Sequence, residues 1–198
     1  MFDLSTLNPP QRQAVETING PVLILAGAGT GKTRVITHRI AYILRKGVAP
    51  GNILGVTFTN KAAREMQERV RKLLPDPRRQ TREPNQKPDR PTICTFHSLC
   101  VRILRRDIGA LGYPSSFTIY DEAGAVRLTS YVLRDLNIDP KRFPARSVHA
   151  VISAAKNELV LPDEYAAKAS SIYERRIADI YREYQMRLQR AGALDFDD

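Results

Sequence analysis

The sequence contains few cysteines and no long apolar run. Its 198 residues include only two cysteines, which are too few for a disulfide scaffold and typical of a protein from a reducing compartment. No stretch approaches the roughly 18 consecutive apolar residues of a membrane-spanning helix, and residues 1–4 lack the basic-then-apolar order of a signal peptide. We therefore expect neither membrane insertion nor secretion, and we predict a cytoplasmic location.

Acidic residues are scarce in the first part of the chain. Residues 1–108 hold 19 basic and 8 acidic side chains and residues 109–198 hold 12 and 13, which gives net charges of +11 and −1, so the whole basic excess lies in the first part. A local basic surplus favours a polyanionic partner, because neutralised phosphates release their counterions. A solvated basic face would give the same charge, and composition leaves both interpretations open.

Strand-like and helix-like segments alternate in the first part. Short apolar runs predict strands at residues 21–26, 53–58 and 92–95, the first of them buried on both faces of a parallel sheet. Apolar residues at helical spacing predict helices at residues 33–46, 60–74 and 96–108. Asn60 is the predicted N-cap of the second helix. This order indicates an α/β fold with a parallel sheet.

The pattern changes further along the chain. Residues 75–91 contain five prolines and almost no apolar side chain, which predicts a mobile surface loop. Beyond residue 108 the chain has a short β-like piece at 117–120, and Asp121 is then well placed as an N-cap. Helices are expected at residues 121–136, 146–157, 162–170 and 172–190. We predict that this second part is all helical.

A glycine-rich segment joins the first predicted strand to the first predicted helix. It reads Ala26-Gly27-Ala28-Gly29-Thr30-Gly31-Lys32-Thr33, with Ala26 in place of the usual first glycine. Glycines let backbone N–H groups and the positive end of the helix face phosphates. Lys32 would then reach the β- and γ-phosphates of a purine triphosphate, and the Thr33 hydroxyl would coordinate Mg²⁺. Because strand, loop and helix agree, a chance glycine-rich turn is the poorer explanation.

Gln11 lies on a predicted helix start just upstream of this loop. Its amide can both donate to and accept from an adenine edge, a pairing that suits ATP over GTP. By itself this signal is weak.

Two further motifs follow the second and third predicted strands. They comprise Thr57, Phe58, Thr59, Asn60 and Lys61, and Thr95, Phe96, His97 and Ser98. Ligands usually bind at this edge of an α/β sheet, and an aromatic ring beside a helix N-terminus is an element of a single-strand binding track. The spacing is equally compatible with Phe58 and Phe96 as core residues at strand ends.

Candidate metal ligands are few. Asp195, Asp197 and Asp198 form the only late acidic cluster, but the residues before them do not resemble a buried strand, so a turn or a helix N-terminus is favoured over a Mg²⁺ site. Cys94 and Cys100 flank His97 in the pattern C-x-x-H-x-x-C. Since no fourth ligand is near in sequence, we favour buried thiols over a zinc site.

At these motifs the chain resembles superfamily 1 DNA helicases of the PcrA/UvrD/Rep group. Residues 7–15 resemble the Q motif, residues 26–33 the Walker A loop, residues 57–63 motif Ia and residues 95–98 the next DNA-contacting motif. Residues 100–108, 152–158 and 194–198 resemble the PcrA branch most. The resemblance runs in family order over essentially the whole chain.

The resemblance implies a layout and an activity. Residues 1–108 would be the first part of a RecA-like P-loop NTPase domain, residues 109–193 an inserted helical domain that approaches duplex DNA, and residues 194–198 the return to the RecA-like domain. The activity would be that of a 3′→5′ helicase of DNA repair and replication. ATP and Mg²⁺ would be its cofactors, and single-stranded DNA and single/double-strand junctions its partners.

The resemblance also implies roles for single residues. Gln11 and Arg34 would contact the adenine end of ATP, Lys32 the phosphates and Thr33 the Mg²⁺. Phe58 would stack on a DNA base or hold it in a pocket, with Thr57, Asn60, Thr95 and His97 near the strand.

The family's Asp-Glu motif and its second RecA-like domain with an arginine finger are not in this sequence. We therefore expect these residues to be the N-terminal part of a helicase, monomeric and inactive alone. A small complete P-loop enzyme such as a nucleotide kinase and a non-catalytic DNA-binding module built on residues 109–198 are the alternatives.

Overall fold

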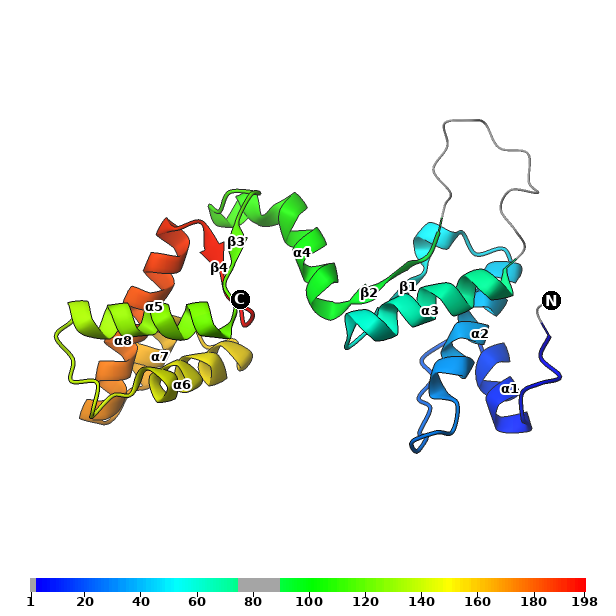
Figure 1. The fold of residues 1–198 in the computed structure, drawn as a ribbon, viewed down its shortest axis with the longest axis horizontal. Helices are drawn as coiled ribbons and strands as arrows, with labels where there is room; N and C mark the ends of the chain where they lie inside the picture. Colours follow the sequence, from blue (N-terminus) through cyan, green and yellow to red (C-terminus); the bar gives the residue numbers. More distant parts are fainter. Residues whose placement is uncertain (1–2, 75–89) are drawn as a thin grey trace. The chain divides into compact units, whose positions relative to one another are not determined.

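The computed structural model describes residues 3–74 and 90–198. Most of the predicted loop at residues 75–91 lies outside these ranges. The chain divides into two compact units between Cys100 and Val101. This boundary falls within one helix, α4 (Phe96–Asp107; Figure 1).

The first unit is an α/β structure. Its helices and strands in chain order are α1 (Pro9–Glu16), α2 (Lys32–Arg45), a 3-10 turn (Pro50–Asn52), β1 (Leu54–Thr57), α3 (Asn60–Leu73), β2 (Thr92–Thr95) and the start of α4. The strands β1 and β2 are parallel, with Leu54 opposite Thr92 and Thr57 opposite Thr95. Both strands therefore end at the same edge of the sheet.

Two small apolar clusters hold this unit together. The first lies where α2 and α3 meet the sheet, and its buried members are Ile40, Ile53, Met66, Val70 and Ile93. The second joins α1 to α2 through Leu7, Val15 and Val35. Gly55 allows the close packing of the first cluster, because a Cβ atom there would lie 3.2 Å from Cγ1 of Ile93.

The predicted strand at residues 21–26 is not formed. These residues join no ladder in the described sheet, and Leu23 and Leu25 are 83% and 86% exposed. A strand needs a hydrogen-bonded neighbour as well as an apolar sequence, and here β1 pairs with β2 instead. The expectation that this run is a strand buried on both faces is therefore wrong for this structure.

The start of α3 also differs from the prediction. Thr59, not Asn60, is the N-cap: its backbone is extended, and its hydroxyl accepts a hydrogen bond from the Ala62 N–H at 3.1 Å. Asn60 is instead the first residue of the helix. Either residue type suits an N-cap, and the backbone at Thr59 decides between them.

The second unit is mainly helical. Beyond α4 it contains a 3-10 turn (Ile108–Leu111), β3 (Thr118–Ile119), α5 (Glu122–Asp135), α6 (Ala145–Asn157), α7 (Pro162–Lys168), α8 (Ile172–Arg190) and β4 (Ala193–Leu194). Asp121 caps α5 as predicted, accepting from the Gly124 N–H at 2.8 Å. The main core lies between α5, α6 and α8 and includes Ile152, Ile177 and Tyr184.

This unit is not all helical, which corrects that prediction: β3 confirms the β-like piece expected at residues 117–120, and β4 was not predicted. Strands β3 and β4 pair in parallel, with Thr118 opposite Ala193 and Ile119 opposite Leu194. Ala193 and Leu194 are both buried, so the residues before the acidic cluster do form a buried strand. The two residues of β4 are too few to show a strand pattern. Their partner strand, β3, lies far away in the sequence.

None of the described helices is long and apolar enough to cross a membrane.

Candidate nucleotide and nucleic-acid site

The glycine-rich loop leads directly into α2. Gly29 and Gly31 have φ values of +76° and +87°, which favour glycine because other residues are strained there. Gly31 is the N-cap, and α2 begins at Lys32. The Thr30 hydroxyl donates to the Gly27 carbonyl at 2.7 Å and closes the turn. The loop thus ends at a helix N-terminus, the position at which backbone N–H groups bind anions.

Lys32 lies over its own loop. Its Nζ donates to the carbonyl oxygens of Ala26 at 2.9 Å and Gly27 at 2.6 Å. Both acceptors are neutral carbonyls, which bind an ammonium less strongly than an anionic phosphate oxygen does. An incoming triphosphate can therefore replace them.

Gln11 contacts this loop directly. Its Nε2 donates to the Thr30 carbonyl at 3.0 Å, and its Oε1 accepts from the Asn8 N–H at 3.2 Å in a capping box. A glutamine amide has two donor hydrogens and two acceptor lone pairs, so one of each is left. One donor and one acceptor are what an adenine edge requires.

Thr33 and Arg34 occupy the first turn of α2, where Thr33 is half-buried and Arg34 is exposed. Within residues 3–74 and 90–198, no group of three His, Cys, Asp or Glu side chains could hold a metal ion. The Thr33 hydroxyl is an oxygen ligand of the kind that Mg²⁺ prefers, and phosphate oxygens of a bound nucleotide would supply further ligands. The residues present fit a metal that arrives with the nucleotide.

The two aromatic motifs lie together at one edge of the sheet. Phe58 directly follows β1 and Phe96 directly follows β2, and the strands end opposite each other at Thr57 and Thr95. Phe58 is 90% exposed and Phe96 61% exposed. Neither ring belongs to the core of the described residues, so both are accessible for stacking.

The hydroxyls of Thr57 and Thr95 form hydrogen bonds with the residues that follow the two strands. Thr95 is buried; its Oγ1 accepts from the Ser98 N–H at 3.2 Å and donates to the Ser98 hydroxyl at 2.9 Å. Thr57 donates to the Thr59 carbonyl at 3.0 Å. These contacts fix the loops that present the aromatic rings. Lys61 and His97 are exposed at the start of α3 and α4.

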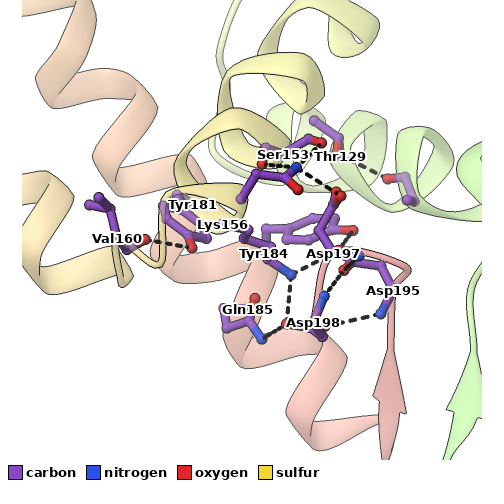
Figure 2. A network of polar contacts seen from close by, with 12 residues as sticks. Thr129, Ser153, Lys156, Val160, Tyr181, Tyr184, Gln185, Asp195, Asp197 and Asp198 are labelled. Atoms are coloured by element: carbon purple, nitrogen blue, oxygen red, sulfur yellow. Dashed lines mark hydrogen bonds and ion pairs between the residues drawn. The ribbon is translucent and has the colours of Figure 1, made fainter. Parts of the chain in front are cut away.

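The late acidic cluster forms a turn, as predicted. The Asp195 carboxylate accepts from the N–H groups of Asp197 and Asp198 at 3.0 and 2.9 Å. Its other oxygen accepts from Lys156 Nζ and from the Tyr184 hydroxyl, each at 2.8 Å (Figure 2). Lys156 also donates to Asp198 at 2.8 Å. These carboxylates are therefore engaged with a buried cation.

Burial and charge act in opposite directions at Asp195. Burial by itself raises the pKa of a carboxyl group, but the charge and hydrogen bond of Lys156 outweigh it and hold the pKa of Asp195 below its ordinary value. Burial, together with the nearby Asp195, raises the pKa of Tyr184, which stays protonated and donates to Asp195. The cluster is a satisfied ion-pair network.

Sequence reasoning missed Lys156 as the partner of this cluster. Residues 152–158 stand out by resemblance, but the lysine lies on α6 and its acceptors lie 39 and 42 positions further on. No local pattern predicts such a contact.

The cysteine prediction needs correction. Cys94 is half-buried on β2, and Cys100 is exposed on α4, so they are not a pair of buried thiols. Within the described residues, neither cysteine belongs to a group of His, Cys, Asp or Glu side chains that could hold a metal ion.

A glycine-rich loop that leads into a helix beginning with lysine and threonine matches the loop-to-helix part of the P-loop pattern, although the predicted strand before it is not formed. A family model for the UvrD/REP helicase N-terminal domain matches residues 7–198, and the chain belongs to this family.

Several curated helicases are similar to this chain. It is 50% identical over 196 residues to the ATP-dependent DNA helicase PcrA of Bacillus subtilis (strain 168). It is 47% identical to that of Staphylococcus aureus (strain Mu50 / ATCC 700699) and 45% identical to that of Staphylococcus epidermidis (strain ATCC 35984). Each alignment covers 98% of this chain and 25% or 26% of the relative. The chain thus spans about a quarter of the length of these relatives.

Proposed function

We propose that these residues are the ATP-binding and DNA-contacting N-terminal part of an ATP-dependent DNA helicase. The observation that carries the proposal is the shared sheet edge, at which exposed Phe58 and Phe96 follow two parallel strands of the unit that also holds the phosphate loop. Aromatic rings beside helix N-termini suit single-stranded DNA, because bases stack on the rings and phosphates face the N–H groups. Family membership and the similarity to PcrA helicases support the same function.

The roles of the nucleotide-binding residues follow from their chemistry. The backbone of residues 26–31 would surround the phosphates, with the Lys32 ammonium moving from its carbonyl contacts to the β- and γ-phosphate oxygens. Thr33 would hold the Mg²⁺ that neutralises developing charge during phosphoryl transfer. Gln11 and Arg34 would contact the adenine end.

The roles of the DNA-contacting residues rest on their position at the edge. Phe58 and Phe96 would stack on bases, while Thr59, Asn60, Lys61 and His97 would lie along the sugar-phosphate backbone. Thr57 and Thr95 would contribute mainly by fixing these loops, because their hydroxyls already bond within the protein.

The layout of the whole protein is part of the proposal. Residues 1–108 would belong to a RecA-like motor domain, residues 109–193 to an insertion near duplex DNA and residues 194–198 to the return into the motor domain. We propose 3′→5′ translocation on single-stranded DNA toward single/double-strand junctions, in repair and replication, by a monomer in the cytoplasm.

These 198 residues should not turn over ATP by themselves. Asp195 follows a buried strand, β4, but this strand belongs to the second unit, and the carboxylate is bound to Lys156 and Tyr184. This engagement also disfavours the alternative of a small complete P-loop enzyme, which needs a carboxylate available for the metal. The near-neutral composition of residues 109–198 disfavours a separate DNA-binding module.

Strand displacement tests the proposal. The natural full-length protein and its Lys32→Ala variant would be assayed with ATP on duplexes that carry a 3′ or a 5′ single-stranded tail. We expect DNA-stimulated hydrolysis, unwinding of the 3′-tailed duplex only, and loss of at least about a hundredfold in turnover in the variant. Unwinding from the 5′ tail would exclude the polarity, and hydrolysis unaffected by the variant would exclude the site.

A second experiment measures ATP hydrolysis by the 198 residues alone. Multiple-turnover hydrolysis by them, lost on Lys32→Ala, would favour the small complete enzyme instead.

A further inference from the structure

Helix α1 carries Gln11 but has little stability of its own. It is eight residues long and has no basic residue in its last turn, and isolated helices of this length are marginal in water. The position of the Gln11 amide therefore depends on what holds α1 in place.

Contacts in its first and its last turn attach α1 to the loop and to α2. Gln11 bonds to Asn8 and Thr30 near the first turn, and Val15 packs in the cluster that contains Val35 of α2. Side-chain packing thus holds the far end of the helix, but it leaves the backbone carbonyls there without partners within the helix.

Arg39 of α2 holds that far end. Its Nη1 donates to the Ala14 carbonyl at 2.6 Å and also to the Thr17 carbonyl. Carbonyls at a helix C-terminus lack partners within the helix, and the local dipole there favours a cation. Arg39 thus supplies from another helix the positive charge that the last turn of α1 lacks.

The same helix carries the phosphate-binding lysine. Lys32 begins α2, and Arg39 lies seven residues, about two turns, further along it. Helix α1 lies beside α2 (Figure 1). Its start is bound to the loop that leads into α2 through the Gln11–Thr30 hydrogen bond, and its end is bound to α2 itself through Arg39.

We infer that Arg39 is a positioning residue for adenine recognition, which holds α1 against α2 so that the remaining donor and acceptor of Gln11 face the base. This inference rests on the proposed nucleotide site. Arg39 touches neither the base nor the phosphates, and its effect passes through Gln11.

A double-mutant cycle tests the inference in the natural full-length protein. The variants are Arg39→Ala, Gln11→Ala and the double variant. The measurements are KM and kcat for MgATP and MgGTP with single-stranded DNA present, and the affinities for non-hydrolysable analogues of both nucleotides. The control is Arg64→Ala, which removes an exposed arginine from α3 of the same unit.

We expect Arg39→Ala to lower the preference for ATP over GTP about fivefold, the loss of roughly one hydrogen bond, with kcat within twofold of the wild type. Gln11→Ala should lower it to the same extent, and the double variant should add nothing, because coupled residues are not additive. Arg64→Ala should leave the preference unchanged.

A second variant of Arg39 is used if the first variant does not fold. If circular dichroism shows that Arg39→Ala is unfolded, Arg39→Gln keeps a long polar side chain, and it should still lower the preference for ATP. An unchanged preference in a folded Arg39 variant, equal losses for ATP and GTP, or an additive double variant would overturn the inference.

Measurements on the wild type distinguish failure of this inference from failure of the proposed function. A wild-type protein that prefers ATP, with Arg39 variants that keep the preference, would refute the role of Arg39 alone. A wild type that hydrolyses neither nucleotide would refute both.

Discussion

The two units of the chain use their apolar residues differently. The first unit divides its buried residues between two small clusters and exposes Leu23, Leu25, Phe58 and Phe96. The second unit has one larger core between α5, α6 and α8, with a small second cluster around Ile108, Phe117 and Leu194. The units thus differ in how their buried side chains are grouped, while both expose large apolar side chains, such as Leu25 in the first and Leu159 in the second.

The charged residues are also distributed differently in the two parts of the chain. The basic surplus lies in the first part of the sequence with the phosphate loop and the aromatic edge. The second unit instead contains a buried ion-pair network, with Lys156 only 7% exposed. The first part of the sequence therefore carries the surplus of cations, whereas the second unit contains a cation that is buried and paired.

Removing one charge of this network should have the largest effect on stability. We expect Asp195→Asn to destabilise the second unit by about 3 kcal/mol, because Lys156 stays buried with one carboxylate partner fewer. Urea denaturation followed by tyrosine fluorescence measures this, since seven of the eight tyrosines lie in residues 101–198. Asp163→Asn, which removes the exposed partner of Arg182, is the control and should change little.

The same network makes the second unit sensitive to acid. The pKa of Asp195 lies below its ordinary value of 3.8, so its contribution to stability is present above that value and is lost as pH falls through the folded-state pKa. Denaturation midpoints from pH 7 down to pH 3 should fall less in Asp195→Asn than in the wild type. Parallel curves would contradict the assignment.

Phe58→Ala should affect DNA binding without affecting stability. Loss of a stacking platform is expected to weaken binding of a single-stranded oligonucleotide about tenfold, while the ring is too exposed to contribute to the core. Fluorescence anisotropy at fixed salt measures the affinity. Leu111→Ala, an exposed apolar residue of the second unit, is the control, and equal losses in both variants would remove the distinction between the units.

Gly55→Ala tests how tightly the first unit is packed. Its Cβ would lie 3.2 Å from Cγ1 of Ile93 and 3.5 Å from Cδ1 of Ile40, and we expect a destabilisation of about 1 kcal/mol. Hydrogen exchange of the β1 and α3 amides would detect it. At Gly109 a Cβ has nothing within 4 Å, so Gly109→Ala should be tolerated; equal protection in both variants would indicate a loosely packed first unit.

The smallest effect concerns a helix cap of the second unit. Hydrogen bonds from the Ser171 and Ser170 N–H groups and from the Ser170 hydroxyl lower the pKa of Glu174 to about 2. An NMR titration of the Glu174 carboxyl should show this value, and Ser170→Ala, which removes the hydroxyl donor, should raise it. A titration near the ordinary value of 4.5 would mean that the cap is open in solution.

The sequence predicted elements whose signals are local. Helix α8 and strand β2 have the predicted limits, and Asp121 caps α5 as expected. These features depend on helical periodicity, a compact apolar run and a side chain that bonds three residues away. The run at residues 21–26 has an equally strong pattern, yet it forms no strand because a ladder requires a partner.

By itself, then, the sequence determined the α/β character of the first unit, the helices of the second, the glycine-rich loop before α2 and the family. Tertiary structure alone decided that β4 pairs with β3, that Lys156 meets Asp195, that Phe58 and Phe96 are exposed at one edge, and that Arg39 holds the end of α1. Periodicity and capping act over a few residues, whereas these contacts join residues far apart in the chain. Which partner a side chain finds is fixed only when packing brings the elements together.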